Sequence, residues 1–303
     1  MITIVGTGRV GSTIASQLAA EELADITLID IVQGLPQGEA LDIAHMAAQR
    51  NVDVDVVGSN EYSALAGSDL VIVVAGFARR PDMTRMDLLN KNAAIVKQVS
   101  DQIRQHAPGS MVMMVTNPMD VMTYVALKIT GFPANRIFGM GGMLDSSRFR
   151  HLLAKSLGFS YSSVNAMVIG EHGEAMTPLA SRASVGGISI KDLLSEANIA
   201  EAVEKTRKVA AEVISLKGAT FYAPAQGVVK MAEAILKDRK SVFPVSAYLQ
   251  GEFGVSGICI GVPAILGKGG VERVIELPLE GDERDSFLRG AQAIKSAISG
   301  LQL

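Results

Sequence analysis

The chain opens with MITIVGTGRVG, residues 1–11, and this stretch decides its fold. Residues 2–5 form a short apolar run without polar alternation, as in a strand buried on both faces. Residues 6–11 then match the Gly-x-Gly-x-x-Gly pattern, and apolar side chains three or four residues apart follow, which predict a helix. Strand, glycine turn and helix in this order predict the first unit of a dinucleotide-binding sheet.

Each glycine of this turn has a predicted task. Gly6 permits the tight turn, Gly8 lets the backbone approach a pyrophosphate, and Gly11 allows the helix to pack closely on the strand. The start of the helix offers free N–H groups and a positive dipole end to the phosphates. With Arg9 and Val10 between them, these glycines are the predicted cofactor-binding loop.

An acidic residue completes the fingerprint. Asp30 follows the next apolar run, 19 positions after Gly11. A carboxylate there accepts hydrogen bonds from the ribose hydroxyls of NAD and repels the 2′-phosphate of NADP. Because residues 31–34 contain no Lys or Arg, the sequence predicts NAD as the cofactor.

The rest of the first half repeats the strand–helix pattern. Apolar runs recur at residues 26–29, 70–75, 111–115 and, more weakly, 136–140, while residues 52–57 alternate Val and Asp like a half-exposed strand. We therefore expect an α/β fold, with a Rossmann doubly wound parallel sheet as the NAD-binding domain over residues 1–143. The mixed pattern that follows predicts an α+β catalytic domain over residues 144–303, ending in a helix at 282–299 with Asp282 as its N-cap.

Composition excludes several classes of protein. The 303 residues carry a net charge of -3, so there is no basic field for nucleic acid. The longest apolar stretches fall far short of the roughly 20 residues that a membrane-spanning helix needs. No basic region precedes the first strand, and the single cysteine, Cys259, sits in an apolar run, so we expect a reduced, cytoplasmic protein. No cluster has metal-ligand spacing, and no metal is expected.

Four polar stretches stand beside apolar runs. They are RRPDMTR at 79–85, TNP at 116–118, LDSSR at 144–148 and GEHG at 170–173. Asp145 and Arg148 are three residues apart and share one helical face. Oxidation of a hydroxy acid needs a base for the hydroxyl proton, a seat for carboxylates and positive charge on the developing carbonyl oxygen, and these stretches contain such groups.

With these motifs in order, the chain resembles the malate/lactate dehydrogenase family, most closely its malate dehydrogenases of the lactate-dehydrogenase-like type. The similarity runs from Met1 to the final helix. Besides the glycine loop and the four polar stretches, it includes LPQGEALD at 35–42 and YAP at 222–224.

The resemblance implies roles for five residues. His172 is the proton-relay histidine and Asp145 its carboxylate partner. Arg148 grips the C1 carboxylate of the substrate, and Arg85 polarises the C2 oxygen. Arg79 occupies the specificity position, where arginine matches the malate type and would bind a second carboxylate, whereas lactate enzymes carry an uncharged residue.

The resemblance also adds two asparagines. Asn117 is expected to bind both substrate and cofactor near the nicotinamide, with a cis peptide bond to the following Pro118, and Asn92 is expected to bind the cofactor. Two residues depart from the family pattern: Asp82, where glycine is common, and Thr220, where related malate enzymes often have a small residue.

The function implied is malate dehydrogenase: reversible NAD-dependent oxidation of (S)-malate to oxaloacetate by hydride transfer with a His/Asp proton relay, as in the tricarboxylic acid cycle. The alternative is a lactate or other 2-hydroxy acid dehydrogenase, against which Arg79 argues. An NAD-dependent glycoside hydrolase or a non-catalytic NAD-binding regulator fits the residues less well. The expected partner is a small dicarboxylic acid, with no nucleic acid or membrane, and family members form homodimers or homotetramers.

Overall fold

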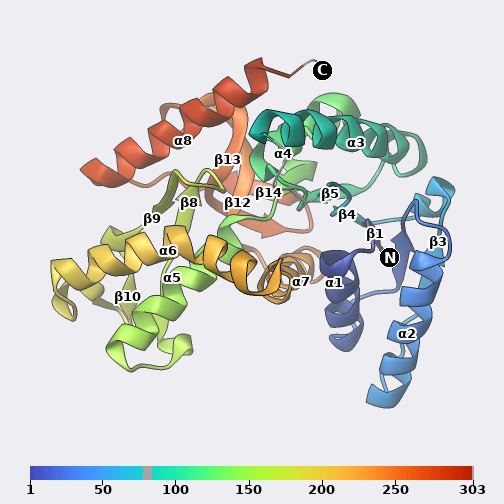
Figure 1. Ribbon diagram of the computed structural model, residues 1–303, viewed down its shortest axis with the longest axis horizontal. Coiled ribbons are helices and arrows are strands. Elements are labelled where there is room, and N and C mark those ends of the chain that lie inside the picture. Colours follow the sequence, from blue (N-terminus) through green and yellow to red (C-terminus); the bar gives the residue numbers. More distant parts are fainter. Residues whose placement is uncertain (78–83, 302–303) are drawn as a thin grey trace.

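The computed structural model describes residues 1–77 and 84–301 (Figure 1). Its first half contributes six parallel strands in the order β3-β2-β1-β4-β5-β6, which is the doubly wound arrangement expected from the sequence. The strands are β1 (Ile2–Val5), β2 (Ile26–Ile29), β3 (Val56–Ser59), β4 (Leu70–Val73), β5 (Met111–Met114) and β6 (Ile137–Gly139).

The same sheet continues into the second half of the chain. Beyond β6 it adds four antiparallel strands in the order β12-β13-β8-β9, and β14 pairs with β13. These strands are β8 (Val168–Gly170), β9 (Met176–Pro178), β12 (Ser241–Gln250), β13 (Ser256–Gly267) and β14 (Gly270–Val274). A separate three-stranded sheet is built from β7 (Val164–Asn165), β10 (Ser184–Val185) and β11 (Ile188–Ser189).

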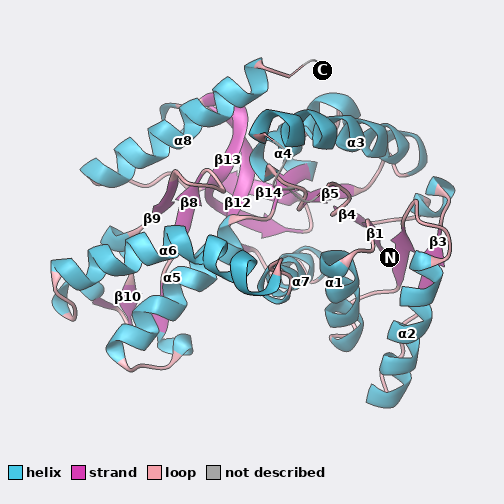
Figure 2. Ribbon diagram, viewed as in Figure 1, coloured by secondary structure: helices cyan, strands magenta, loops and turns pink. Residues whose placement is uncertain are grey.

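Helices cover both faces of the large sheet (Figure 2). One face packs against α1 (Arg9–Ala20), α2 (Leu35–Arg50) and α7 (Tyr222–Leu236). The other packs against α3 (Arg85–His106), α4 (Met119–Thr130) and α8 (Gly281–Ser299). Helices α5 (Gly142–Leu157) and α6 (Glu196–Lys217) enclose a third core with the small sheet. No helix of the described residues is long and apolar enough to cross a bilayer.

The continuous apolar runs follow from this double covering. In β1, Ile2 and Ile4 point into the core on one face of the sheet, while Val5 points into the core on the other. In β4, Leu70 and Val71 divide in the same way. Side chains alternate along a strand, so a strand buried on both faces has no exposed positions and shows no regular alternation of apolar and charged residues.

Two local predictions were wrong. The strand expected at residues 52–57 lies at 56–59, because the N–H groups of Asp53 and Asp55 bond to acidic side chains before the strand pairing with β2 begins. The N-cap of α8 is Glu280 rather than Asp282, because the Glu280 side chain and Glu283 cap one another's backbone N–H groups.

Candidate active site

The glycine loop between β1 and α1 has the geometry that its spacing predicts. Gly6 has φ 101°, and a Cβ there would lie 2.6 Å from the backbone nitrogen of Ala75. A Cβ on Gly11 would collide with the carbonyl oxygen of Gly6. A Cβ on Gly8 would meet no protein atom within 4 Å. The outer glycines therefore serve close packing, while the middle one borders open space.

The start of α1 is free for an anion. Its N-cap, Gly8, provides no side-chain hydrogen bond to the first turn, and Arg9 beside it is exposed. Asp30 stands next to this turn, with Oδ2 accepting the backbone N–H of Thr7 at 2.7 Å and Oδ1 accepting that of Val32 at 3.0 Å. A helix start without a side-chain cap, and a carboxylate bonded to the loop before it, fit the pyrophosphate and ribose of NAD.

Asn92 ties together the segments that leave β4 and β5. It is 1% exposed on α3, and its Oδ1 accepts the backbone N–H of Phe77 at 2.7 Å. Its Nδ2 donates to the carbonyl of Asn117 at 2.6 Å and to that of Phe77 at 3.2 Å. The amide thus bonds to the protein at both ends, and its expected contact with the cofactor stays a prediction.

Asn117 lies at the carboxyl end of β5. The bond to Pro118 is cis, as the resemblance implied, and the residue is exposed. Thr116 before it donates its hydroxyl to the carbonyl of Ala75 at 2.8 Å, which joins the ends of β4 and β5.

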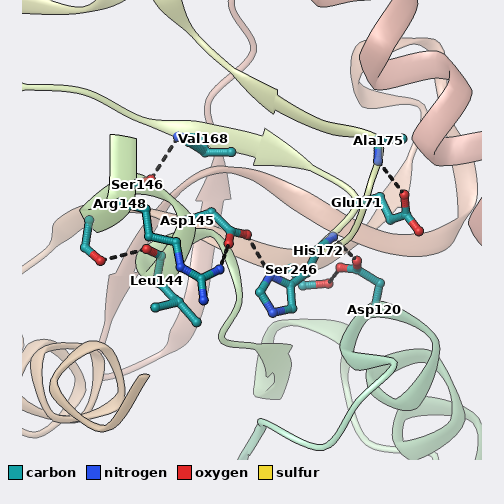
Figure 3. A network of polar contacts seen from close by, with 11 residues as sticks. Asp120, Leu144, Asp145, Ser146, Arg148, Val168, Glu171, His172, Ala175 and Ser246 are labelled. Atoms are coloured by element: carbon teal, nitrogen blue, oxygen red, sulfur yellow. Dashed lines mark hydrogen bonds and ion pairs between the residues drawn. The ribbon is translucent and has the colours of Figure 1, made fainter. Parts of the chain in front are cut away.

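Two predicted catalytic residues, His172 and Asp145, meet the predicted substrate-binding Arg148 in one cluster (Figure 3). Asp145, in the first turn of α5, has a side chain 2% exposed and lies between His172 and Arg148. Its Oδ2 is 2.6 Å from Nδ1 of His172, and its Oδ1 accepts a hydrogen bond from Nη1 of Arg148 at 3.1 Å. Because Nδ1 faces the carboxylate, Nε2 of the imidazole is left to exchange a proton with a substrate.

The electrostatics of the cluster favour a charged imidazole. Burial by itself would lower the pKa of His172, but the charge and hydrogen bond of Asp145 outweigh it, and Asp120 adds to them, so the pKa lies above its ordinary value. Burial lowers the pKa of Arg148, opposed by Asp145. The guanidinium side chain is 12% exposed and still carries its charge toward the site.

Two residues that the sequence analysis missed lie behind His172. Asp120, 3% exposed, accepts the backbone N–H of His172 at 2.7 Å and the hydroxyl of Ser246 at 2.6 Å (Figure 3). A charged residue at the start of the apolar helix α4, three positions after Asn117, was the available signal for Asp120. Nothing in the sequence marks Ser246, which reaches Asp120 only through the pairing of β12 with β6.

Glycines let the two halves of the chain approach closely at this point. A Cβ on Gly141 would lie 2.7 Å from Cγ of His172, and a Cβ on Gly142 would lie 2.7 Å from Cβ of Pro244. A Cβ on Gly139 would lie 2.6 Å from Oγ1 of Thr123. We call residues 139–142 the glycine seam. It brings the first turn of α5, with Asp145, against the imidazole.

Four residues singled out in the sequence are not part of this cluster as the structure describes it. Arg79 and Asp82 lie outside the described residues. Arg85 begins α3, whose start is fixed by reciprocal hydrogen bonds between Thr84 and Asp87, and its side chain is also outside the description. The Thr220 hydroxyl is buried and has no hydrogen-bond partner among the described residues.

No metal site is visible in residues 1–77 and 84–301. No three His, Cys, Asp or Glu side chains there gather in a way that could hold a metal ion. Cys259 is buried and unpaired, and burial raises its pKa well above the ordinary value, so it is an unreactive thiol.

The structure combines a Rossmann sheet that carries an open glycine loop with a histidine–aspartate–arginine cluster. This combination is that of an NAD-dependent dehydrogenase. Two family models cover nearly the whole chain: the NAD-binding domain of lactate/malate dehydrogenase matches residues 1–139, and the α/β C-terminal domain matches residues 142–302. The chain belongs to the lactate/malate dehydrogenase family.

Individual relatives are similar over their full length. The malate dehydrogenase of Methanosarcina acetivorans is 46% identical over 302 residues, which cover 99% of this chain and 98% of the relative. The solved structure of the Aeropyrum pernix malate dehydrogenase has a TM-score of 0.96 at 44% identity, covering 100% of this chain and 98% of its own. The solved structure of the Cryptosporidium parvum lactate dehydrogenase, complexed with lactic acid and NAD, has a TM-score of 0.94 at 40% identity. The match covers 98% of this chain and 96% of that one.

Proposed function

We propose that this chain is an NAD-dependent malate dehydrogenase that interconverts (S)-malate and oxaloacetate. The hydrogen bond of 2.6 Å between Asp145 and His172, with Arg148 on the same carboxylate, carries the proposal that the reaction is hydroxy acid oxidation. The choice of malate is supported by the names of the full-length relatives and by Arg79, whose positive charge suits a second substrate carboxylate.

The residues divide the work as follows. Gly6, Gly8 and Gly11 with Asp30 would hold NAD, which supplies the hydride acceptor when bound. Nε2 of His172 takes the proton of the C2 hydroxyl during oxidation and returns it during reduction. Asp145 holds Nδ1–H and stabilises the imidazolium that forms.

Arginine and asparagine side chains would orient the substrate. We assign the C1 carboxylate to Arg148, whose planar fork can bond both oxygens. Arg85 is assigned to the C2 oxygen, where positive charge stabilises the developing alkoxide, and Asn117 to the substrate beside the nicotinamide. Arg9, Val10 and Asn92 complete the proposed cofactor site.

Arg79 would set specificity by charge balance. Oxaloacetate brings a C4 carboxylate to this arginine, whereas pyruvate brings a methyl group and leaves it desolvated without a partner. An uncompensated buried charge costs about 3–5 kcal/mol, so we expect roughly 10²–10⁴-fold discrimination in kcat/KM.

The test measures kcat/KM for oxaloacetate and pyruvate by NADH absorbance in wild type, Arg79→Gln and Arg80→Gln. Arg79→Gln should collapse oxaloacetate reduction and raise pyruvate reduction, while the neighbouring Arg80→Gln should change little. If wild type preferred pyruvate, the lactate dehydrogenase alternative would replace this proposal. If Arg80→Gln switched the preference instead, the specificity role would belong to that position.

We also propose a domain boundary at residues 143/144 and a cytoplasmic homodimer or homotetramer. The boundary lies four residues beyond the end of the matched NAD-binding domain and two residues into the second match. A single, buried cysteine fits the proposed compartment, and family resemblance supports the assembly. Light scattering with size-exclusion chromatography would give the subunit count.

A further inference from the structure

A second carboxylate lies against His172, on the opposite side from Asp145 (Figure 3). Asp120 is the second residue of α4, and both of its oxygens accept hydrogen bonds: Oδ2 from the backbone N–H of His172 and Oδ1 from the hydroxyl of Ser246. Asp120 thereby joins α4, β12 and the segment after β8. Its hydrogen bonds reach the backbone of His172 rather than the imidazole ring, and the mechanism above makes no use of it.

We propose that Asp120 is a positioning residue: its carboxylate fixes the backbone of His172 so that the ring meets Asp145, and its charge favours the protonated imidazole. The inference deepens the proposed function and rests on it only in taking His172 as the group that exchanges the proton.

The charge of Asp120 needs an explanation that its hydrogen bonds do not give. A neutral asparagine could accept the same backbone N–H through Oδ1 and donate to the Ser246 oxygen through Nδ2. Burying a carboxylate is far more costly than burying an amide. Near an imidazole that must accept and release a proton, however, the negative charge has a use, because it stabilises the cationic form.

The groups around Asp120 decide when that charge is present. Burial raises the pKa of Asp120 to about 6, although Ser246 and the backbone and charge of His172 act in the opposite direction; Glu171, beside His172, raises it further. From β13, the buried Cys259 faces the same carboxylate, and from α5 the pair of Asp145 and Arg148 faces the imidazole. At pH 7 and above, Asp120 is mainly ionised and His172 lies between two carboxylates.

The test is a titration of the His172 ring by NMR in protein labelled at histidine, alongside the pH profile of (S)-malate oxidation. The chain has four histidines, and the signal missing from His172→Gln identifies the right one. Asp120→Asn removes the charge and can keep both hydrogen bonds. Thr130→Val, at the far end of the same helix, is the matched control because its hydroxyl bonds only to nearby backbone, donating to the carbonyl of Ala126 and accepting the N–H of Phe132.

We expect Asp120→Asn to lower the pKa of His172 by about 0.5–1 unit, a roughly 3–10-fold weaker hold on the proton. The acid limb of malate oxidation should move to lower pH by the same amount, with the plateau rate kept within several-fold. Thr130→Val should move neither. An unchanged His172 pKa in folded Asp120→Asn would overturn the inference, since a purely structural residue would lower activity equally at all pH values.

Ser246→Ala keeps the proposal testable if Asp120→Asn fails to fold. It removes the hydroxyl that stabilises the carboxylate, so Asp120 is protonated at higher pH and the pKa of His172 should fall by a smaller amount; no fall would count against the proposal. The readouts also separate the two claims. A shifted His172 signal in a protein that oxidises no hydroxy acid would refute only the proposed function, and an unshifted signal in an active dehydrogenase would refute only the role of Asp120.

Discussion

The cofactor loop and the acid–base cluster solve their tasks in different ways. The loop is six consecutive residues, 6–11, whose work is done by backbone and by missing side chains. The cluster draws side chains from α4, α5, β12 and the segment after β8, over more than a hundred positions of sequence. A backbone site is therefore visible as a contiguous motif, whereas a side-chain site is complete only once the sheet has assembled.

The largest effect should come from the centre of the cluster. Asp145→Asn should lower kcat for malate oxidation by about 10²–10⁴-fold, because the amide cannot stabilise the imidazolium or fix its tautomer. Asp101→Asn is a matched control: Asp101 forms the same i,i+3 contact, with Arg104 at 2.8 Å, but both side chains are exposed. The measurement is the steady-state kcat of both variants. A kcat for Asp145→Asn within a few-fold of wild type would refute the functional pairing of Asp145 with His172.

Two glycine substitutions can separate the packing role of the cofactor loop from its role in binding the cofactor. Gly11→Ala should lower the thermal midpoint by destabilising the fold about 1–3 kcal/mol, because the new methyl group meets the carbonyl of Gly6. Gly8→Ala should leave the midpoint of the cofactor-free protein unchanged, since φ is -69° and the space is open, yet weaken NADH binding about tenfold or more. Thermal unfolding and NADH fluorescence titration measure the two effects. Equal destabilisation by both would show that Gly8 is a packing residue.

Cofactor choice should respond to Asp30. Replacing Asp30 with Ser and Ile31 with Arg should move the ratio of kcat/KM for NADPH over NADH upward by about 10–100-fold, because the 2′-phosphate loses a repelling charge and gains an attracting one. Ile31→Arg alone, with the carboxylate kept, is the control and should move the ratio much less. Equal use of both cofactors by wild type would contradict this interpretation of Asp30.

The remaining effect concerns stability rather than activity, and it vanishes at low pH. The folded-state pKa of Asp120 is raised from 3.8 to about 6, so the native state binds this proton more tightly than the unfolded state. Wild type is therefore stabilised as pH falls from about 6 to about 4, and is penalised by this group above pH 6. Asp120→Asn should be more stable than wild type at pH 8 by roughly 2–3 kcal/mol, with the difference gone by about pH 4.

Urea unfolding at both pH values tests this sign. A variant less stable than wild type at pH 8 would mean that the amide cannot reproduce the bonds to His172 and Ser246. A variant more stable but with a weaker base would show that the buried charge is kept at the expense of stability.

The sequence predicted the parts of the molecule that depend on local pattern. The strands at 2–5 and 26–29 have the expected bounds, and the doubly wound order followed from alternation of strands and helices. His172, Asp145 and Arg148 meet as the resemblance implied. The strand at 52–57 was misplaced because two acidic side chains, distant in sequence, take its first N–H groups. Ser246 could not be predicted, since its role depends on the pairing of β12 with β6.

The glycine seam has a consequence for how this chain tolerates change. It lies at the junction of the two family matches, where a loose linker would accept insertions and larger residues. Here the atoms that a new side chain would strike include the imidazole itself. In a substitution library scored for folded, active protein, residues 139–142 should therefore be among the least variable positions. Chimaeras that exchange whole domains between relatives should be active only when residues 139–142, His172 and Pro244 all come from the same parent.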